Sequence, residues 1–117
     1  MVVTTKINNT EYELSTRLRV AYKVQGCHNH KPYAEIFKNI TDMSLEQQIE
    51  ILYESFADAN PDMRLSLKKQ DFLNYYLDNY KLKQVMSQLQ GVIKGIMGDE
   101  GADDTEDADE EPVNQGN

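Results

Sequence analysis

The sequence predicts a mainly α-helical (α+β) fold, in which a short amino-terminal β-hairpin packs on a bundle of four to five short helices and a disordered acidic tail follows. Three observations indicate it. Residues 2–14 alternate in polarity around a pair of asparagines, later segments repeat apolar residues at helical spacing, and acidic residues accumulate after residue 98. The length of 117 residues fits one small core. We therefore predict a globular domain of residues 1–98 and a tail of residues 99–117.

The net charge of −8 is concentrated in the tail. Residues 99–117 contain nine acidic and no basic residues, so 20 − 9 = 11 acids and all 12 bases remain in residues 1–98, for a net charge of +1. The few apolar residues of the tail cannot offset the entropy of ordering it, which predicts disorder. Two interpretations are open. The tail keeps the protein soluble, or it has a specific role, either mimicking a ligand of a basic partner or shielding an adhesive surface by its charge.

The hairpin prediction depends on Asn8 and Asn9, because both tolerate the positive φ of a tight turn. Residues 16–25 fit either a strand or a helix. We favour a helix capped by Ser15 or Thr16. The side chains assigned to the two buried faces are Val3, Thr5, Ile7, Tyr12 and Leu14 for the hairpin, and Leu14, Leu18, Ala21, Tyr22 and Gln25 for the helix.

Two helices are predicted in the middle of the chain. Pro32 suits the first position of one, after a loop over residues 26–31. A capping box at residues 44–47 begins the other, and Asn60-Pro61 ends it. The expected apolar stripes are Tyr33, Ile36, Phe37 and Ile40 in the first helix and Leu45, Ile49, Leu52, Tyr53 and Phe56 in the second.

Two more helices complete the domain. Ser66 is the predicted cap of the first, and Gly98 ends the second. Gly91 and Gly95 weaken that last helix by about 1 kcal/mol each relative to alanine. The expected stripes are Phe72, Leu73, Tyr76, Leu77 and Tyr80 in one helix and Leu82, Val85, Met86, Leu89, Val92, Ile93 and Ile96 in the other.

The segment Asp58–Lys69 resembles a calcium-binding loop, because oxygen-bearing residues stand at positions 1, 3, 5 and 9. Met63 replaces the glycine of position 6, however, and Lys69 replaces the bidentate glutamate of position 12. We therefore interpret the segment as an Asn-Pro turn with acidic capping residues and predict no metal site.

The sequence predicts neither an enzyme nor a cofactor. Cys27, His28 and His30 are the only Cys and His residues, too few for a closed zinc site and too close together for a catalytic triad. A net charge near zero in residues 1–98 disfavours nucleic acid, and no apolar run is long enough to span a membrane. The start of the chain lacks the apolar segment of a signal peptide, so we expect a soluble cytoplasmic protein.

A partner-binding module is the remaining interpretation. Tyrosine and methionine are favoured at protein interfaces, and both occur near the last two predicted helices. Each of them fits the core equally well. The predicted contact surface is Tyr75, Tyr76, Tyr80, Val85, Met86 and Leu89.

The order of elements resembles that of tail assembly chaperones from long-tailed phages of Gram-positive hosts. The resemblance covers about residues 5–97 and comprises the hairpin Lys6–Leu14, the capped helix Ser44–Tyr53, the Asn60-Pro61 break, a helix with Asp71-Phe72-Leu73 and a terminal amphipathic helix. The acidic tail has no counterpart in it. Catalytic residues are absent from that family, so none transfer.

The resemblance implies a protein that binds the tape measure protein and keeps it soluble in the cytoplasm of the bacterial host while tail tube subunits assemble around it. It also implies absence from the mature virion, the tail tube protein as a further partner, and often a longer form made by frameshifting. A second copy of the chain is a further candidate partner. The alternative is a small adaptor without catalytic activity, either a regulatory domain built on the calcium-loop-like segment or an inhibitor acting through the acidic tail.

Overall fold

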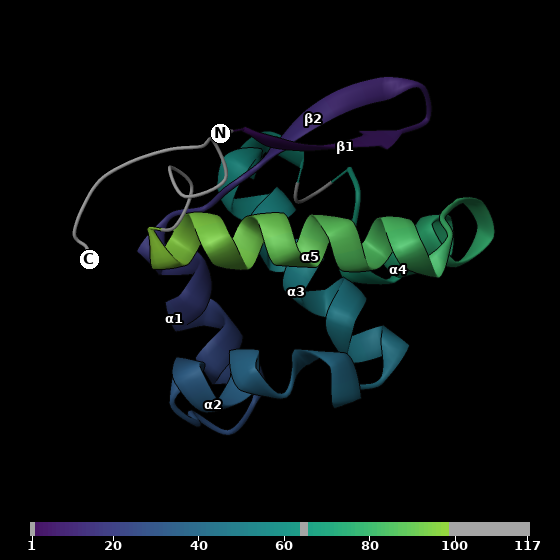
Figure 1. Cartoon of the computed structure of the whole chain (residues 1–117). Coiled ribbons are helices and arrows are strands. Elements are labelled where there is room, and N and C mark those ends of the chain that lie inside the picture. The colour runs from purple at the N-terminus through teal and green to yellow at the C-terminus, as the bar shows by residue number, and fades with distance from the viewer. Residues whose placement is uncertain (1, 64–65, 99–117) are drawn as a thin grey trace, which may run out of the picture.

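The computed structural model describes residues 2–63 and 66–98. A two-stranded hairpin packs on five α-helices (Figure 1). The predicted fold is thereby confirmed for the described residues, and the predicted disordered tail, residues 99–117, lies outside them. The elements are β1 (Val3–Ile7), β2 (Thr10–Leu14), α1 (Leu18–Cys27), α2 (Tyr33–Lys38), α3 (Leu45–Ala59), α4 (Lys69–Asn79) and α5 (Leu82–Met97), with short 3-10 helices η1 (Ile40–Asp42) and η2 (Pro61–Met63).

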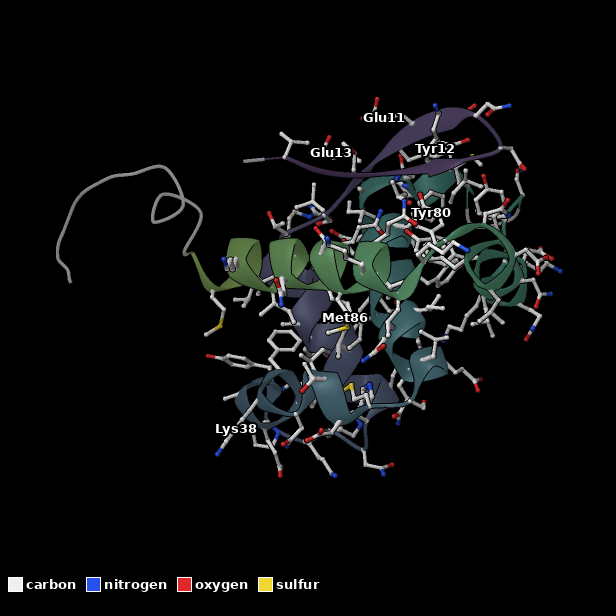
Figure 2. The ribbon with its side chains drawn as sticks, turned by 45° about the vertical axis from the view of Figure 1, so that its right-hand side comes forward. Glu11, Tyr12, Glu13, Lys38, Tyr80 and Met86 are labelled. Atoms are coloured by element: carbon white, nitrogen blue, oxygen red, sulfur yellow. The ribbon has the colours of Figure 1, made fainter. Side chains whose placement is uncertain are left out.

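The hairpin forms as the sequence predicts. Asn8 and Asn9 adopt φ values of 52° and 68°, and the strands pair in antiparallel register from Ile7–Thr10 to Val3–Leu14. Thr5, Ile7 and Leu14 are buried against the helices. Figure 2 shows Glu11 and Glu13 pointing away from them.

Helix α3 lies at the centre of the molecule and contacts α1, α4, α5 and β2. Its start is fixed by the predicted capping box, in which the Gln47 amide donates to Ser44 Oγ at 3.2 Å and the Ser44 amide donates to Gln47 Oε1 at 3.2 Å. Because neighbours surround the helix, it buries more than the predicted stripe: Ile51 is 1% exposed, whereas Leu45 at its start is 40% exposed.

Helix α1 is confirmed, and Leu14 and Ala21 of the predicted face are buried, but its other large residues are not. Val20, Ala21 and Val24 face the core, and Leu18 and Tyr22 are 71% and 73% exposed. Neither Ser15 nor Thr16 caps the helix, because the N-cap is Arg17. Ser15 instead binds the end of α3: its amide donates to Ser55 O at 3.1 Å, and Ser55 Oγ donates to Ser15 O at 2.6 Å. This contact with α3 orients the start of α1.

Three further local predictions need correction. Pro32 is the N-cap of α2 rather than its first residue, and the N-cap of α4 is Lys68, two residues beyond the predicted cap Ser66. In the last two helices Leu77 and Leu82 are 51% and 63% exposed. Leu77 is two residues before the end of α4 and Leu82 is the first residue of α5, so both lie near the corner between the two helices.

Candidate interaction surface

The predicted contact residues divide into two groups. Tyr76, Val85 and Leu89 are at most 3% exposed and belong to the hydrophobic core. In the folded chain they support the surface rather than form it. Tyr75, Tyr80 and Met86 are half-buried and pack against the core with part of each side chain accessible. Figure 2 shows Met86 reaching from α5 toward the layer of α1 and α3. A partner contact at these three residues stays a prediction.

Tyrosine hydroxyls attach the hairpin to α4 and α5. The Tyr80 hydroxyl accepts from the Lys6 amide and donates to the Lys6 carbonyl, both at 2.9 Å, and the Tyr75 hydroxyl accepts from the Asn8 amide at 3.0 Å. Gln88 Nε2 donates to the Thr4 carbonyl at 3.3 Å. These side chains occupy backbone groups on the open edge of β1, which hinders pairing of that edge with another strand.

Beneath this edge lies a buried polar cluster on an aromatic stack. The Tyr76 hydroxyl donates to Gln88 Oε1 at 2.7 Å and lies 2.6 Å from Thr5 Oγ1. The rings of Tyr76 and Tyr80 stack at 4.2 Å, and those of Phe72 and Tyr76 at 4.6 Å. Burial raises the pKa of Tyr76, so its hydroxyl stays protonated and able to donate. The hydrogen bonds of this cluster hold the hairpin against the helices.

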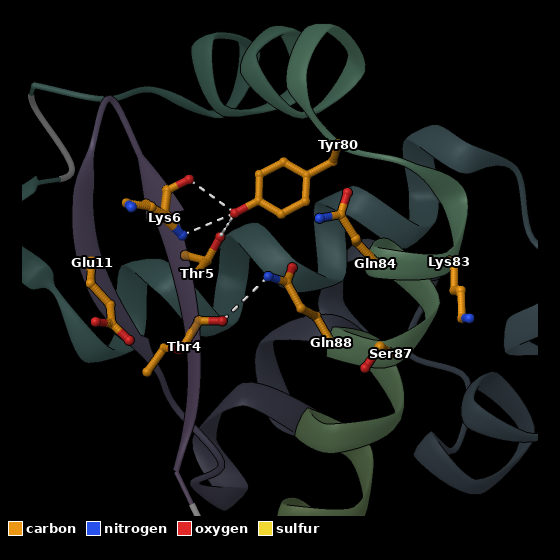
Figure 3. Close-up of a pocket in the computed structure, with 9 residues that line it drawn as sticks. All are labelled: Thr4, Thr5, Lys6, Glu11, Tyr80, Lys83, Gln84, Ser87 and Gln88. Atoms are coloured by element: carbon orange, nitrogen blue, oxygen red, sulfur yellow. Dashed lines mark hydrogen bonds between the residues drawn. The ribbon is translucent and has the colours of Figure 1, made fainter.

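An open groove of about 640 Å³ runs between β1 and the first half of α5 (Figure 3). It offers hydroxyl, amide and charged groups, but neither Cys nor His. Several of its polar groups already bind one another. The lining residues are Thr4, Thr5, Lys6, Glu11, Tyr80, Lys83, Gln84, Ser87 and Gln88.

In the segment that resembles a calcium loop, the Asp58 and Asn60 side chains bind other parts of the chain. The Asp58 carboxylate, 3% exposed, accepts from Arg17 Nε and Nη2 at 2.9 Å each and from Ser15 Oγ. The hydrogen bonds from Arg17 lower the pKa of Asp58. Asn60 Nδ2 donates to Glu13 O at 2.9 Å, and residues 64–65 lie outside the described residues. Within the described part of the chain, no three Cys, His, Asp or Glu side chains gather to hold a metal ion.

Cys27 lies at the end of α1 beside carboxylates of α3. Its Sγ is 4.0 Å from Glu54 Oε2, and Lys69 Nζ lies 2.9 Å from Glu50 Oε2 and 3.6 Å from Glu54 Oε2. Burial and the two glutamates raise the pKa of Cys27, which disfavours the nucleophilic thiolate. In the neighbouring loop, His28 Nε2 is buried and no hydrogen bond reaches it from the described residues.

The outward side of α1 carries apolar and basic residues together. Leu18 and Tyr22 stand one helical turn apart and are the two most exposed large apolar side chains of the described residues. Arg19 and Lys23 lie beside them, and a shallow hollow of about 330 Å³ is lined by Leu18, Arg19 and Tyr22. We call these four residues the α1 outer face. Sequence reasoning missed it by assigning Leu18 and Tyr22 to the core. The signal was the spacing of Val20, Ala21 and Val24, which define the opposite side.

Comparisons with known proteins give no relative to guide the assignment: no family model, no curated protein and no solved structure matches this chain. Among the described helices, none is both long and apolar enough to cross a membrane. The assignment of function therefore depends on the surface alone.

Proposed function

We propose that this chain is a binding protein without catalytic activity that acts as a phage tail assembly chaperone. In this role it holds the tape measure protein soluble in the host cytoplasm until tail tube subunits assemble around it. The observation that carries the proposal is the α1 outer face, where Leu18 and Tyr22 are 71% and 73% exposed. Large apolar side chains that are exposed together on a small protein are typical of a surface that a partner covers.

The chemistry of this face suits an amphipathic helix. Leu18 and Tyr22 share one side of α1, so their side chains can pack on the apolar stripe of a partner helix. Burying a leucine contributes about 1.5–3 kcal/mol, and Arg19 and Lys23 can pair with acidic residues that flank the stripe. A small contact of this kind is reversible, as a chaperone that must leave the finished tube requires. Tyr75, Tyr80 and Met86 are the predicted second contact.

The test is co-expression with the long helical protein encoded beside this gene, followed by pull-down and size exclusion. We expect a soluble complex, with the partner insoluble when it is expressed alone. The variant Leu18→Ser/Tyr22→Ser should lose the complex while keeping its circular dichroism spectrum. Leu77→Ser/Leu82→Ser removes two other exposed apolar side chains and should keep the complex. An insoluble partner in every co-expression would reject the proposal, and loss of the complex only in the second variant would move the contact to the α4–α5 corner.

The calcium-responsive form of the adaptor hypothesis has less support, because Asp58 is already bound by Arg17 and Ser15. Adding calcium to the purified chain separates the two functions. A chaperone of the proposed kind keeps its melting temperature, whereas a calcium-dependent adaptor raises it.

A further inference from the structure

We propose that the acidic segment, residues 99–117, binds the α1 outer face of its own chain. The inference goes beyond the chaperone function and does not depend on which partner the chain binds. It rests on where the segment leaves the fold, on the charges of the two surfaces and on the length of the segment.

The segment leaves the fold beside the start of α1. Helix α5 ends at Met97, and its C-cap Gly98 has a φ of 83°. One turn earlier α5 touches the residues that precede α1, since a Cβ added to Gly95 would lie 2.3 Å from Thr16 Cγ2. Figure 1 shows the carboxyl end of α5 next to the beginning of α1. The described end of α5 therefore lies close to the start of α1.

The charges of segment and face are opposite. Residues 99–117 contain nine acids and no bases, and α1 contains two bases and no acids. Within the described residues neither Arg19 nor Lys23 forms an ion pair, whereas Arg17 is already paired with Asp58. The first acids also follow the negative end of the α5 dipole, which is unfavourable unless cations lie near. Screening over about 8 Å at physiological salt favours cations close to the end of α5; these are Lys94 in its last turn and, across the contact with Thr16, the bases of α1.

The segment is long enough to cover the face. Helix α1 has 10 residues and is about 15 Å long, whereas 19 extended residues reach about 60 Å. Ala102, Ala108 and Val113 offer little apolar surface to Leu18 and Tyr22, so the contact is electrostatic, weak and sensitive to salt. Because it is intramolecular, its effective concentration is in the millimolar range. A segment bound in this way shields the α1 outer face and is displaced by a partner helix with a larger apolar stripe.

The experiment places a nitroxide in the segment of the full-length chain. Cys27, the one cysteine of the sequence, is changed to serine, and Ala108→Cys receives the spin label. Nuclear magnetic resonance then measures how strongly the label broadens the amide signals of each element. We expect the strongest broadening, among elements away from the end of α5, along α1 from Leu18 to Lys23. We expect it to disappear in high salt and in a variant whose five acids between residues 99 and 106 are changed to their amides.

Two matched variants localise the contact. Arg19→Glu/Lys23→Glu should abolish the broadening of α1, and Lys81→Glu/Lys83→Glu, the same change of charge at the other end of α5, should leave it intact. The proposal would be overturned if α1 and α4 were broadened equally, or if the α1 signals stayed broadened in Arg19→Glu/Lys23→Glu. Broadening of an isotope-labelled chain by a separate spin-labelled copy would also overturn it, because the occupant would then be a second molecule. Since the chain is tested alone, failure here leaves the chaperone proposal standing.

Discussion

The two ends of α5 have different surroundings. At its start, tyrosines of α4 and the α4–α5 corner turn inward, stack on one another and give their hydroxyls to the backbone of β1. At its end, α5 approaches the chain before α1 so closely that Gly95 has no room for a side chain, yet the far side of α1 leaves Leu18 and Tyr22 exposed. The tyrosines near the first end hold the hairpin, whereas Leu18 and Tyr22 near the second end are exposed.

This difference shows that a residue type does not by itself reveal its role. Tyr76 and Tyr22 are both helical tyrosines, but one is 1% exposed and holds the hairpin, while the other is 73% exposed and contacts little of the chain. Substitutions that affect the two ends differently are the most direct test of this division.

The largest contrast is expected between two leucines. Leu89→Ala removes a side chain that is 0% exposed and leaves a cavity, which should lower the free energy of unfolding by about 2–5 kcal/mol. Leu18→Ala removes an exposed side chain and should change it by no more than about 0.5 kcal/mol. Urea denaturation of both variants, compared with the unmodified chain, measures the two effects. Similar losses would mean that the α1 outer face is part of the core.

The second contrast is between two glycines of α5. Gly95→Ala should destabilise the fold by about 1–3 kcal/mol, because the new Cβ would lie 2.6 Å from Thr16 Cβ, an atom fixed to the backbone. Gly91→Ala meets only the side chain of Val3, at 3.1 Å, which can move. The better helix propensity of alanine, up to about 1 kcal/mol, should then leave that variant as stable as the unmodified chain or more so.

Thermal unfolding of the two alanine variants measures this contrast. A third variant, Gly95→Ala/Thr16→Gly, removes the atom that the new Cβ meets and should recover part of the loss. If Gly95→Ala is as stable as Gly91→Ala, the close approach between α5 and the start of α1 is not essential.

The predictable parts of the fold are those fixed by neighbours in the sequence. The Asn8-Asn9 turn and the Ser44 capping box depend on residues at most three positions apart, and both were predicted correctly. The role of Gly95 depends on Thr16, which lies 79 residues earlier (95 − 16), and no local pattern reveals that contact.

The buried side of α1 and the role of the tyrosines are harder to predict from the sequence for the same reason. Alternating and helical spacing both fitted residues 16–25, and the side that faces the core is set by α3. Tyr75 and Tyr80 were predicted as contact residues from their chemistry alone. Their hydrogen bonds to Asn8 and Lys6, 67 and 74 residues away, appear only in the folded chain.

The third contrast is between two hydroxyls at the hairpin. Tyr76→Phe removes a hydroxyl that is bonded to Gln88 and close to Thr5 in a buried site. Because these partners lose a hydrogen bond, the free energy of unfolding should fall by about 1–3 kcal/mol. Tyr75→Phe removes an acceptor of the Asn8 amide at an exposed position, where water can replace it, and should cost less. Chemical denaturation gives both values, and amide exchange at Lys6 and Thr5 should accelerate more in the first variant. Equal losses would argue against a buried polar cluster.

The smallest effect concerns the ion pair that joins the start of α1 to α3. Hydrogen bonds from Arg17 lower the pKa of Asp58 in the folded chain below its unfolded value, which is about 3.9. The carboxylate therefore contributes stability above about pH 4, and this contribution is lost as the pH falls through the lower, folded pKa. Because Arg17 is 67% exposed, solvent screens the pair, and we expect a loss of stability smaller than in the three contrasts above. The free energies of unfolding of the unmodified chain and of Asp58→Asn should differ by a constant amount between about pH 5 and 7. The two values should converge below about pH 4. A difference that persists in acid would assign the stabilisation to the neutral hydrogen bond with Ser15 instead of the charge, and Arg17→Gln would then leave stability unchanged.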